Sequence, residues 1–188
     1  MDDIIIEEIR DEKGNLLKTI SMKNSVPHGE TQIFDENGQL SCKVTYENGE
    51  LSGPAEFFLS GNPLMITAFK NGKLDGKVTL FSNGIKNGEA NFKDGVFDGV
   101  FTSFDNSGNV VRIATYIMGK QEGECQSFYP DGTLLESSMY KNNLLDGEVI
   151  KYYPNGSVME TSTFQEGKPV GVIDSYDEDG DLKSSKEV

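Results

Sequence analysis

Side chains able to do acid–base or nucleophilic chemistry do not combine into a recognisable catalytic set in this chain. His28 is the one histidine, and it precedes Gly29 at a position that later copies of the same frame give to Asp75, Asp98 and Asp146. A Ser or Cys nucleophile needs a base held beside it. We therefore interpret His28 as a turn residue rather than a base.

The two cysteines, Cys42 and Cys125, are far apart in the strand arrangement that we expect for this chain. We expect about seven strands between them, which at roughly 4.8 Å per strand is on the order of 34 Å. A disulfide needs Cα atoms within about 7 Å. The cysteines are therefore expected to be free, buried or half-buried thiols, and with one histidine they make no zinc site.

Other ligand motifs are incomplete. The Gly-Lys pairs at 72–73, 119–120 and 167–168 are followed by neither Ser nor Thr, so no phosphate-binding loop is formed. The acidic run 177–181 lacks the spaced ligands and final Glu of a calcium loop, which favours a solvated turn. With 31 acidic residues, no single carboxylate pair can be assigned to glycoside hydrolysis. The sequence predicts no enzyme, cofactor or metal site.

The dominant pattern is instead aromatic. Thirteen aromatic residues recur every twelve positions, apart from two steps of eleven, and such regularity indicates an internal repeat. We regard them as candidate partner-binding or packing residues. They are Phe34, Tyr46, Phe58, Phe69, Phe81, Phe92, Phe104, Tyr116, Phe128, Tyr140, Tyr152, Phe164 and Tyr176.

Glycines and turn residues mark the same frame. Asn-Gly and Asp-Gly pairs, such as Asn48-Gly49 and Asn71-Gly72, supply the positive φ angles of tight hairpin turns. Between turns lie runs of strand length rich in β-branched and aromatic residues, as in 147–153 and 157–164. Strands joined by short turns are antiparallel. The prediction is an all-β fold, an elongated single-layer antiparallel meander of about 14 strands in about seven β-hairpin repeats of 23–24 residues.

Each aromatic residue falls about four positions before a turn, and alternate strands run in opposite directions. We therefore expect two rows of rings, one near each rim of the sheet. Cross-strand packing is the expected role of the rings, since such pairs stabilise sheets. The alternative is that one row lines an exposed groove for a partner.

The ends of the chain follow the frame less closely. Residues 1–25 are expected to form an N-terminal cap or degenerate repeat, residues 26–182 the repeat array, and residues 183–188 a polar tail. The acidic start has no basic n-region, and no stretch approaches 18 apolar residues, so neither a signal peptide nor membrane insertion is predicted. The cytoplasm is the expected compartment.

Charge narrows the choice of partner. The formal net charge is −14 and the 17 basic residues do not cluster, so nucleic acid and anionic membrane surfaces would be repelled. A basic protein would be attracted. The alternative is that the charge only keeps a long sheet soluble.

The frame aromatic-x-Asn-Gly-x-x-x-Gly occurs at residues 46–53 and 69–76, and Tyr-Tyr-Pro-Asn-Gly occurs at residues 152–156. With the related segments at 92–95, 116–119, 128–132, 140–143 and 164–167, the chain resembles the MORN-repeat variant proteins of bacteria. Many of these are labelled as the antitoxin component of a toxin–antitoxin pair (the YwqK-like family). The resemblance implies an interaction protein that neutralises a toxin.

Together these observations lead to a functional hypothesis. The protein is expected to be a non-enzymatic, protein-binding repeat scaffold, with an antitoxin or immunity protein that covers a basic toxin as its most concrete form. The alternative is a structural spacer or self-assembly module that forms a homodimer through its sheet face, because a single layer leaves one face in need of cover.

Overall fold

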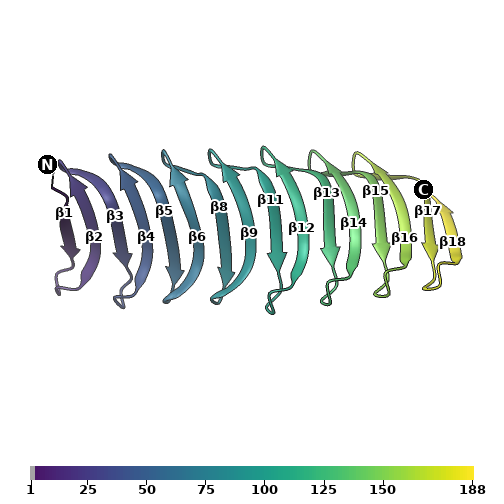
Figure 1. Ribbon diagram of the computed structural model, residues 1–188, viewed down its shortest axis with the longest axis horizontal. Coiled ribbons are helices and arrows are strands. Elements are labelled where there is room, and N and C mark those ends of the chain that lie inside the picture. Colours follow the sequence, from purple (N-terminus) through teal and green to yellow (C-terminus); the bar gives the residue numbers. More distant parts are fainter. Residues whose placement is uncertain (1–2) are drawn as a thin grey trace. The chain divides into compact units, whose positions relative to one another are not determined.

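The computed structural model describes residues 3–188, and these residues form strands and turns without a helix. The chain divides into two compact units. Unit 1 contains the residues up to Lys86 together with Asn91–Val96, and unit 2 contains Asn87–Ala90 and Phe97–Val188. In each unit the strands lie side by side in chain order (Figure 1).

The first eight strands belong to unit 1, and the next two are shared between the units. They are β1 (Ile5–Arg10), β2 (Leu16–Lys23), β3 (Val26–Phe34), β4 (Leu40–Glu47), β5 (Glu50–Leu59), β6 (Asn62–Lys70), β7 (Lys73–Leu74), β8 (Gly76–Ser82), β9 (Ile85–Lys93) and β10 (Val96–Phe97).

The remaining strands belong to unit 2. They are β11 (Gly99–Phe104), β12 (Val110–Ile117), β13 (Lys120–Phe128), β14 (Leu134–Lys141), β15 (Leu144–Tyr152), β16 (Val158–Gln165), β17 (Lys168–Tyr176) and β18 (Leu182–Glu187).

Sequence neighbours pair antiparallel within each unit, as in β3–β4, β4–β5, β13–β14 and β14–β15. The predicted all-β antiparallel meander of hairpins is therefore confirmed. Residues 3–188 form 18 strands rather than the predicted number of about 14. The extra strands arise because both ends of the chain carry strands and because β7/β8 and β10/β11 are each separated by a single residue. Residues 182–187, most of them expected in a polar tail, form β18 and pair with β17.

Two kinds of turn connect the strands. At one end of the hairpins, two-residue turns have positive φ at both positions, as at Asn48 (50°) and Gly49 (88°). This is the geometry that Asn-Gly predicts. At the other end, most turns have five residues. In these the first residue's amide donates to the fifth residue's carbonyl, and the glycine amide donates back, as in Asp35–Gln39 at 2.8 and 3.0 Å.

The two eleven-residue steps in the aromatic period have a direct structural cause. They span Phe58 to Phe69 and Phe81 to Phe92. At these two places the five-residue turn found elsewhere at this end of the hairpins is replaced by a tight turn with positive φ, at Ser60-Gly61 and at Asn83-Gly84. A shorter turn shifts the frame without changing which residues face each other.

Acid should weaken the five-residue turns that begin with aspartate. The Asn109 side chain and backbone amide donate to the Asp105 carboxylate and hold its pKa below the usual value, and Asn15 does the same for the pKa of Asp11. Because the folded pKa is lowered, this stabilisation is complete above the unfolded pKa of about 4 and is lost as pH falls through the folded value.

The corresponding experiment is urea unfolding of the wild type and the double variant D11N/D105N between about pH 5 and pH 2.5. The wild-type midpoint should fall more steeply with acid than that of the variant. Identical pH dependence in the two proteins would show that these carboxylates do not stabilise the turns.

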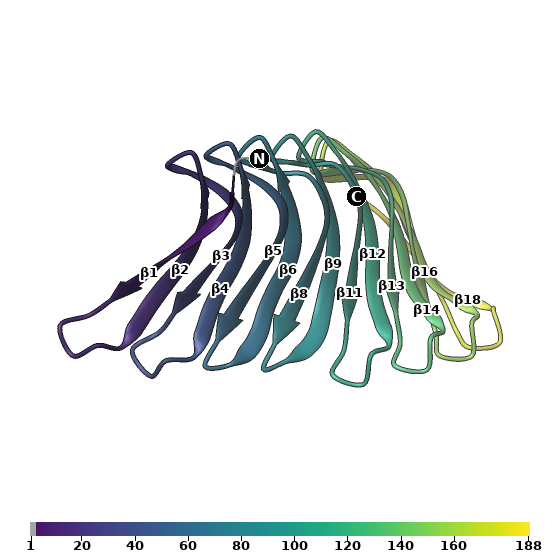
Figure 2. The same ribbon diagram turned by 60° about the vertical axis from the view of Figure 1, so that its left-hand side comes forward.

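Glycines inside strands have a separate role. Gly53 (φ 111°) and Gly147 (φ 124°) lie where the register with the preceding strand shifts, so each sits in a β-bulge that residues other than glycine adopt at a cost. The same frame position is glycine with positive φ at 29, 76, 99, 123 and 171. Strands such as β2, β4 and β6 bend along their length (Figure 2). Bulges bend and twist strands in this way.

Candidate protein-binding face

The thirteen periodic aromatic residues are all half-buried. Seven form a first aromatic row at the carboxyl ends of β3, β5, β8, β11, β13, β15 and β17, from Phe34 to Tyr176. The other six form a second aromatic row, next to last in β4, β6, β9, β12, β14 and β16, from Tyr46 to Phe164. In each unit the two rows lie at opposite ends of the antiparallel strands. Whether the rings bind a partner stays a prediction.

Residues of the second aromatic row lie opposite bulge glycines. Tyr46 lies opposite Gly29, and Phe164 lies opposite Gly147. In unit 2, Tyr116 lies opposite Gly99 and stacks on Phe97 with ring centroids 4.1 Å apart and planes 20° apart. The Tyr116–Phe97 stack shows that one ring of this row packs against a neighbouring ring, and for the others a packing role stays a prediction.

Between the aromatic rows runs a central row of mostly small residues that oppose each other directly. Adjacent members pair as Thr31 with Val44 and Val44 with Ala55 in unit 1, and as Ala114 with Cys125 in unit 2. The row also contains the half-buried Ile20, Phe101 and Ile173. Its other interior members are buried, with exposed fractions between 0% and 6%. They are Thr31, Val44, Ala55, Thr67 and Val78 in unit 1, and Ala90, Ala114, Cys125, Ser138, Val149 and Ser162 in unit 2. A partner would therefore meet the neighbouring rows instead.

In unit 1 the row next to it is apolar from β3 to β8, and on β2 it continues with Lys18, which opposes Ile33. Ile33 opposes Cys42, Cys42 opposes Phe57, Phe57 opposes Met65, and Met65 opposes Leu80. We call these five residues the apolar row. Directly opposed residues share a face, and so do alternate residues of a strand, so the apolar row lies on the face of the central row. Ile33 is 36% exposed and the others are half-buried.

In unit 2 the equivalent row is polar. It runs through Ser103, Arg112, Ser127, Glu136, Lys151, Glu160 and Ser175, each opposite the next. We call it the charged row. Lys151 and Glu160 form an ion pair at 2.8 Å, and the Arg112 Nε donates to the Cys125 sulfur at 3.1 Å. The same frame position thus carries opposite chemistry in the two units.

Sequence reasoning missed these two rows because strand alternation puts Ile33 and Phe34 on opposite faces. The register shifts between them, so Ile33 opposes Cys42 while Phe34 opposes Leu40. The same shift occurs between Phe57 and Phe58. In unit 1 apolar residues (Ile33, Phe57 and Leu80) directly precede the first-row rings, which was a signal in the sequence, but only the register assigns these residues to a row.

The chemically competent residues lie apart from one another. The His28 Nδ1 accepts a hydrogen bond from the Asn48 amide at 3.4 Å, next to a turn. Both cysteines are free, and burial raises the pKa of the Cys42 thiol. Among residues 3–188, no group of His, Cys, Asp or Glu is arranged to hold a metal ion.

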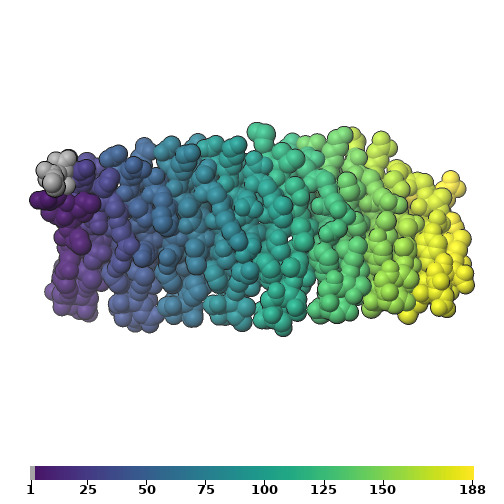
Figure 3. All heavy atoms as spheres, viewed as in Figure 1, coloured from purple at the N-terminus to yellow at the C-terminus, as the bar shows by residue number. Residues whose placement is uncertain are grey.

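Hollows in the surface are found between neighbouring turns. One is lined by Leu59, Ser60, Asn62, Pro63, Leu64 and Asn83, and another by Asn15, Leu16, Phe34, Glu36, Asn37 and Gly38. Side chains close over the backbone of each unit on the face seen in Figure 3. Within the described part of the chain there is no helix of the length and apolarity needed to cross a membrane.

Successive antiparallel hairpins, each with two aromatic positions, bulge glycines and a buried central row, define a β-hairpin repeat protein. Four segments, residues 27–48, 97–118, 121–142 and 145–166, match the MORN repeat variant, and each covers about one hairpin. MORN repeats are in general modules that bind proteins or membranes. No curated protein matches the chain.

Proposed function

We propose that this protein is a non-enzymatic, cytoplasmic protein-binding scaffold, and that its partner docks on the apolar row of unit 1. The apolar row spans β3 to β8 without a polar interruption. Apolar side chains that keep part of their surface in solvent are typical of the centre of a protein interface.

The comparison between the two units carries this proposal. Unit 2 builds the same hairpins with Ser, Glu and Lys at the positions where unit 1 has Ile33, Phe57 and Met65. The fold therefore does not require apolar residues at this position. A contact with another molecule supplies a reason for them that hairpin packing alone does not.

The charge of the chain supports a basic partner. With 31 acidic and 17 basic residues, the protein would attract a basic surface and accelerate its docking, an effect that salt screens. Our specific proposal is an antitoxin that covers a basic toxin, in keeping with the antitoxin label of the YwqK-like proteins that the sequence resembles. The partner's apolar side chains would occupy the apolar row, and its basic residues would be attracted by the overall negative charge of the chain.

A pair of adjacent residues provides a matched test of the docking face. Met65 belongs to the apolar row, whereas Ile66, opposite Glu56, points to the other face and is 43% exposed. Met65→Lys should weaken binding of the basic partner about tenfold or more, which corresponds to roughly 1.4 kcal/mol. Ile66→Lys adds the same charge one residue away and should leave affinity nearly unchanged.

The measurement is isothermal titration calorimetry with the product of the neighbouring gene, which this proposal expects to be a small basic protein. It is made at low and high salt, with circular dichroism to confirm folding. Equal affinity for the two variants would refute docking on the apolar row. If the wild type self-associates and Met65→Lys abolishes this, the apolar row is covered by a second copy instead.

The antitoxin proposal has its own readout. Co-expression of the wild type should restore growth of cells that express the neighbouring basic protein, and Met65→Lys should fail to do so while Ile66→Lys succeeds. A neighbouring protein that is harmless when expressed alone would rule out the antitoxin role and leave the scaffold proposal standing.

A further inference from the structure

The central row changes character at the two end strands. On β1 its position is occupied by Glu7, opposite Ile20, and on β18 by Lys186, opposite Ile173. Glu7 lies three residues before Arg10, as Thr31 lies three residues before Phe34, and Lys186 lies two before Val188, as Ser162 lies two before Phe164. Every other residue of the row is uncharged: Ile20, Thr31, Val44, Ala55, Thr67, Val78, Ala90, Phe101, Ala114, Cys125, Ser138, Val149, Ser162 and Ile173.

A charge at this position is tolerated only at an open edge or beside a charge of opposite sign. Val44, Ala114 and Val149, which have strands on both sides, are at most 5% exposed. An unpaired charge buried to that extent costs several kcal/mol. By contrast, all residues of β1 and β18 are exposed. The residue types themselves therefore mark β1 and β18 as end strands.

The signs of the two charges discriminate between possible edge contacts. Pairing two copies of β1 would bring Glu7 close to Glu7, and pairing two copies of β18 would bring Lys186 close to Lys186. Like charges across a strand pair are destabilising, and inward-pointing charges are a common way to protect edges. A contact between β18 of one copy and β1 of another brings opposite charges together.

The strand directions allow that contact. β16 and β18 are both antiparallel to β17, and β1 and β3 are both antiparallel to β2. A copy of β1 added beside β18 would therefore continue the alternation of the meander. In the register of β4 and β5, where the central residues Val44 and Ala55 oppose each other, Lys186 and Glu7 would be direct cross-strand neighbours.

We propose that copies of this protein associate head to tail, with β18 of one copy pairing antiparallel with β1 of the next and Lys186 opposite Glu7. The contact completes the backbone hydrogen bonding of two edges and covers Ile9, which is 45% exposed, and Leu182, which is 59% exposed. It is separate from the apolar row and does not depend on the proposed partner.

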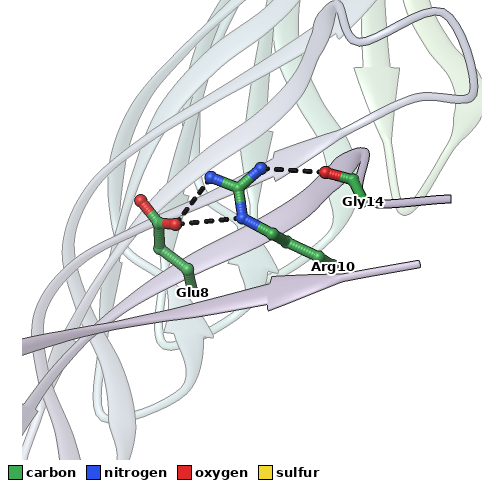
Figure 4. A network of polar contacts seen from close by, with 3 residues as sticks. All are labelled: Glu8, Arg10 and Gly14. Carbon is green, nitrogen blue, oxygen red and sulfur yellow. Dashed lines mark hydrogen bonds and ion pairs between the residues drawn. The ribbon is translucent and has the colours of Figure 1, made fainter. Parts of the chain in front are cut away.

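The surroundings of the pair set the strength of the contact. Arg10 would approach Lys183, but its guanidinium is already neutralised by Glu8 at 2.7 Å and held by the Gly14 carbonyl at 2.9 Å (Figure 4). At the adjoining turns, Asp11 and Glu12 would lie near the acidic turn 177–181. The repulsion between these acidic turns keeps the association weak. Physiological salt screens this repulsion more than it screens the attraction between Lys186 and Glu7 on paired strands.

The test is sedimentation velocity at about physiological ionic strength, over protein concentrations from low micromolar to near-millimolar. The average mass of the wild type should rise with concentration. Glu7→Lys or Lys186→Glu alone should abolish the rise, and the double variant E7K/K186E should restore it. An equimolar mixture of the two single variants should also associate, because each supplies the charge that the other lacks.

Three results would overturn the proposal. The wild type could stay monomeric throughout. The single charge reversals could associate like the wild type. Alternatively, the variants Glu7→Thr and Lys186→Ser, which place uncharged residues like Thr31 and Ser162 at these positions, could associate more strongly than the wild type. That result would mean that the two charges oppose association. Met65→Lys serves as the control for association through the apolar row and should behave like the wild type here.

Discussion

Replacing Gly147 with valine should lower the free energy of unfolding by about 3 kcal/mol or more. Gly147 has φ 124°, and a Cβ built there lies 2.9 Å from the Met139 Cβ, closer than real Cβ contacts come. Backbone strain of this kind costs about 1–3 kcal/mol, and forcing extra atoms into a packed site adds about 1–3 kcal/mol. A branched side chain at a bulge bears both costs.

Gly132→Val is the matched control for that result. Gly132 also has a positive φ, 89°, but a Cβ there meets no heavy atom within 4 Å. Gly132→Val should therefore lower the free energy of unfolding only by the cost of backbone strain, about 1–2 kcal/mol. Urea unfolding followed by circular dichroism measures both. Equal losses for the two variants would show that the close approach of β14 to the bulge contributes nothing.

Tyr116→Ala should destabilise the protein by about 2–4 kcal/mol, near the low end of the range for truncating a buried ring because Tyr116 is half-buried. The ring stacks on Phe97, which in turn packs edge-on against Phe101 with centroids 6.2 Å apart. Removing Tyr116 therefore leaves Phe97 without its stacking partner and uncovers the backbone at Gly99.

A double-mutant cycle with Phe97→Ala separates stacking from simple burial. The coupling between Tyr116 and Phe97 should be about 0.5–1.5 kcal/mol, as for other aromatic pairs. Tyr116→Phe keeps the ring and should cost far less than Tyr116→Ala. A coupling near zero would mean that the rings of the second aromatic row do not depend on their stacking partners.

Much of the fold could be predicted from the sequence because one physical constraint recurs in every repeat. A ring such as Tyr116 opposite a glycine such as Gly99 needs a fixed number of residues between turns, so aromatic and glycine spacing specify the hairpins. The strands were also placed correctly across the two eleven-residue steps, from Phe58 to Phe69 and from Phe81 to Phe92. The shorter turns that cause these steps were not predicted.

The candidate site was less accessible to sequence reasoning. The pairing partners of Phe57 and Phe58 depend on a register shift that falls between these two residues. Neither the composition nor the aromatic period predicts such a shift. The charged ends of the central row were hidden for the same reason. Glu7 and Lys186 look like ordinary surface charges until the register places them in line with Val44 and Ala114.

Methionine-methyl NMR tests the central claim, that a protein partner docks on the apolar row, most directly. Met65 belongs to that row, whereas Met118 is a 78% exposed turn residue of unit 2, and Met139 follows the central-row residue Ser138 and so points to the opposite face. Titration with the basic partner should shift or broaden the Met65 methyl signal and leave those of Met118 and Met139 in place. A complex that moves Met118 or Met139 while Met65 stays unchanged would contradict the account.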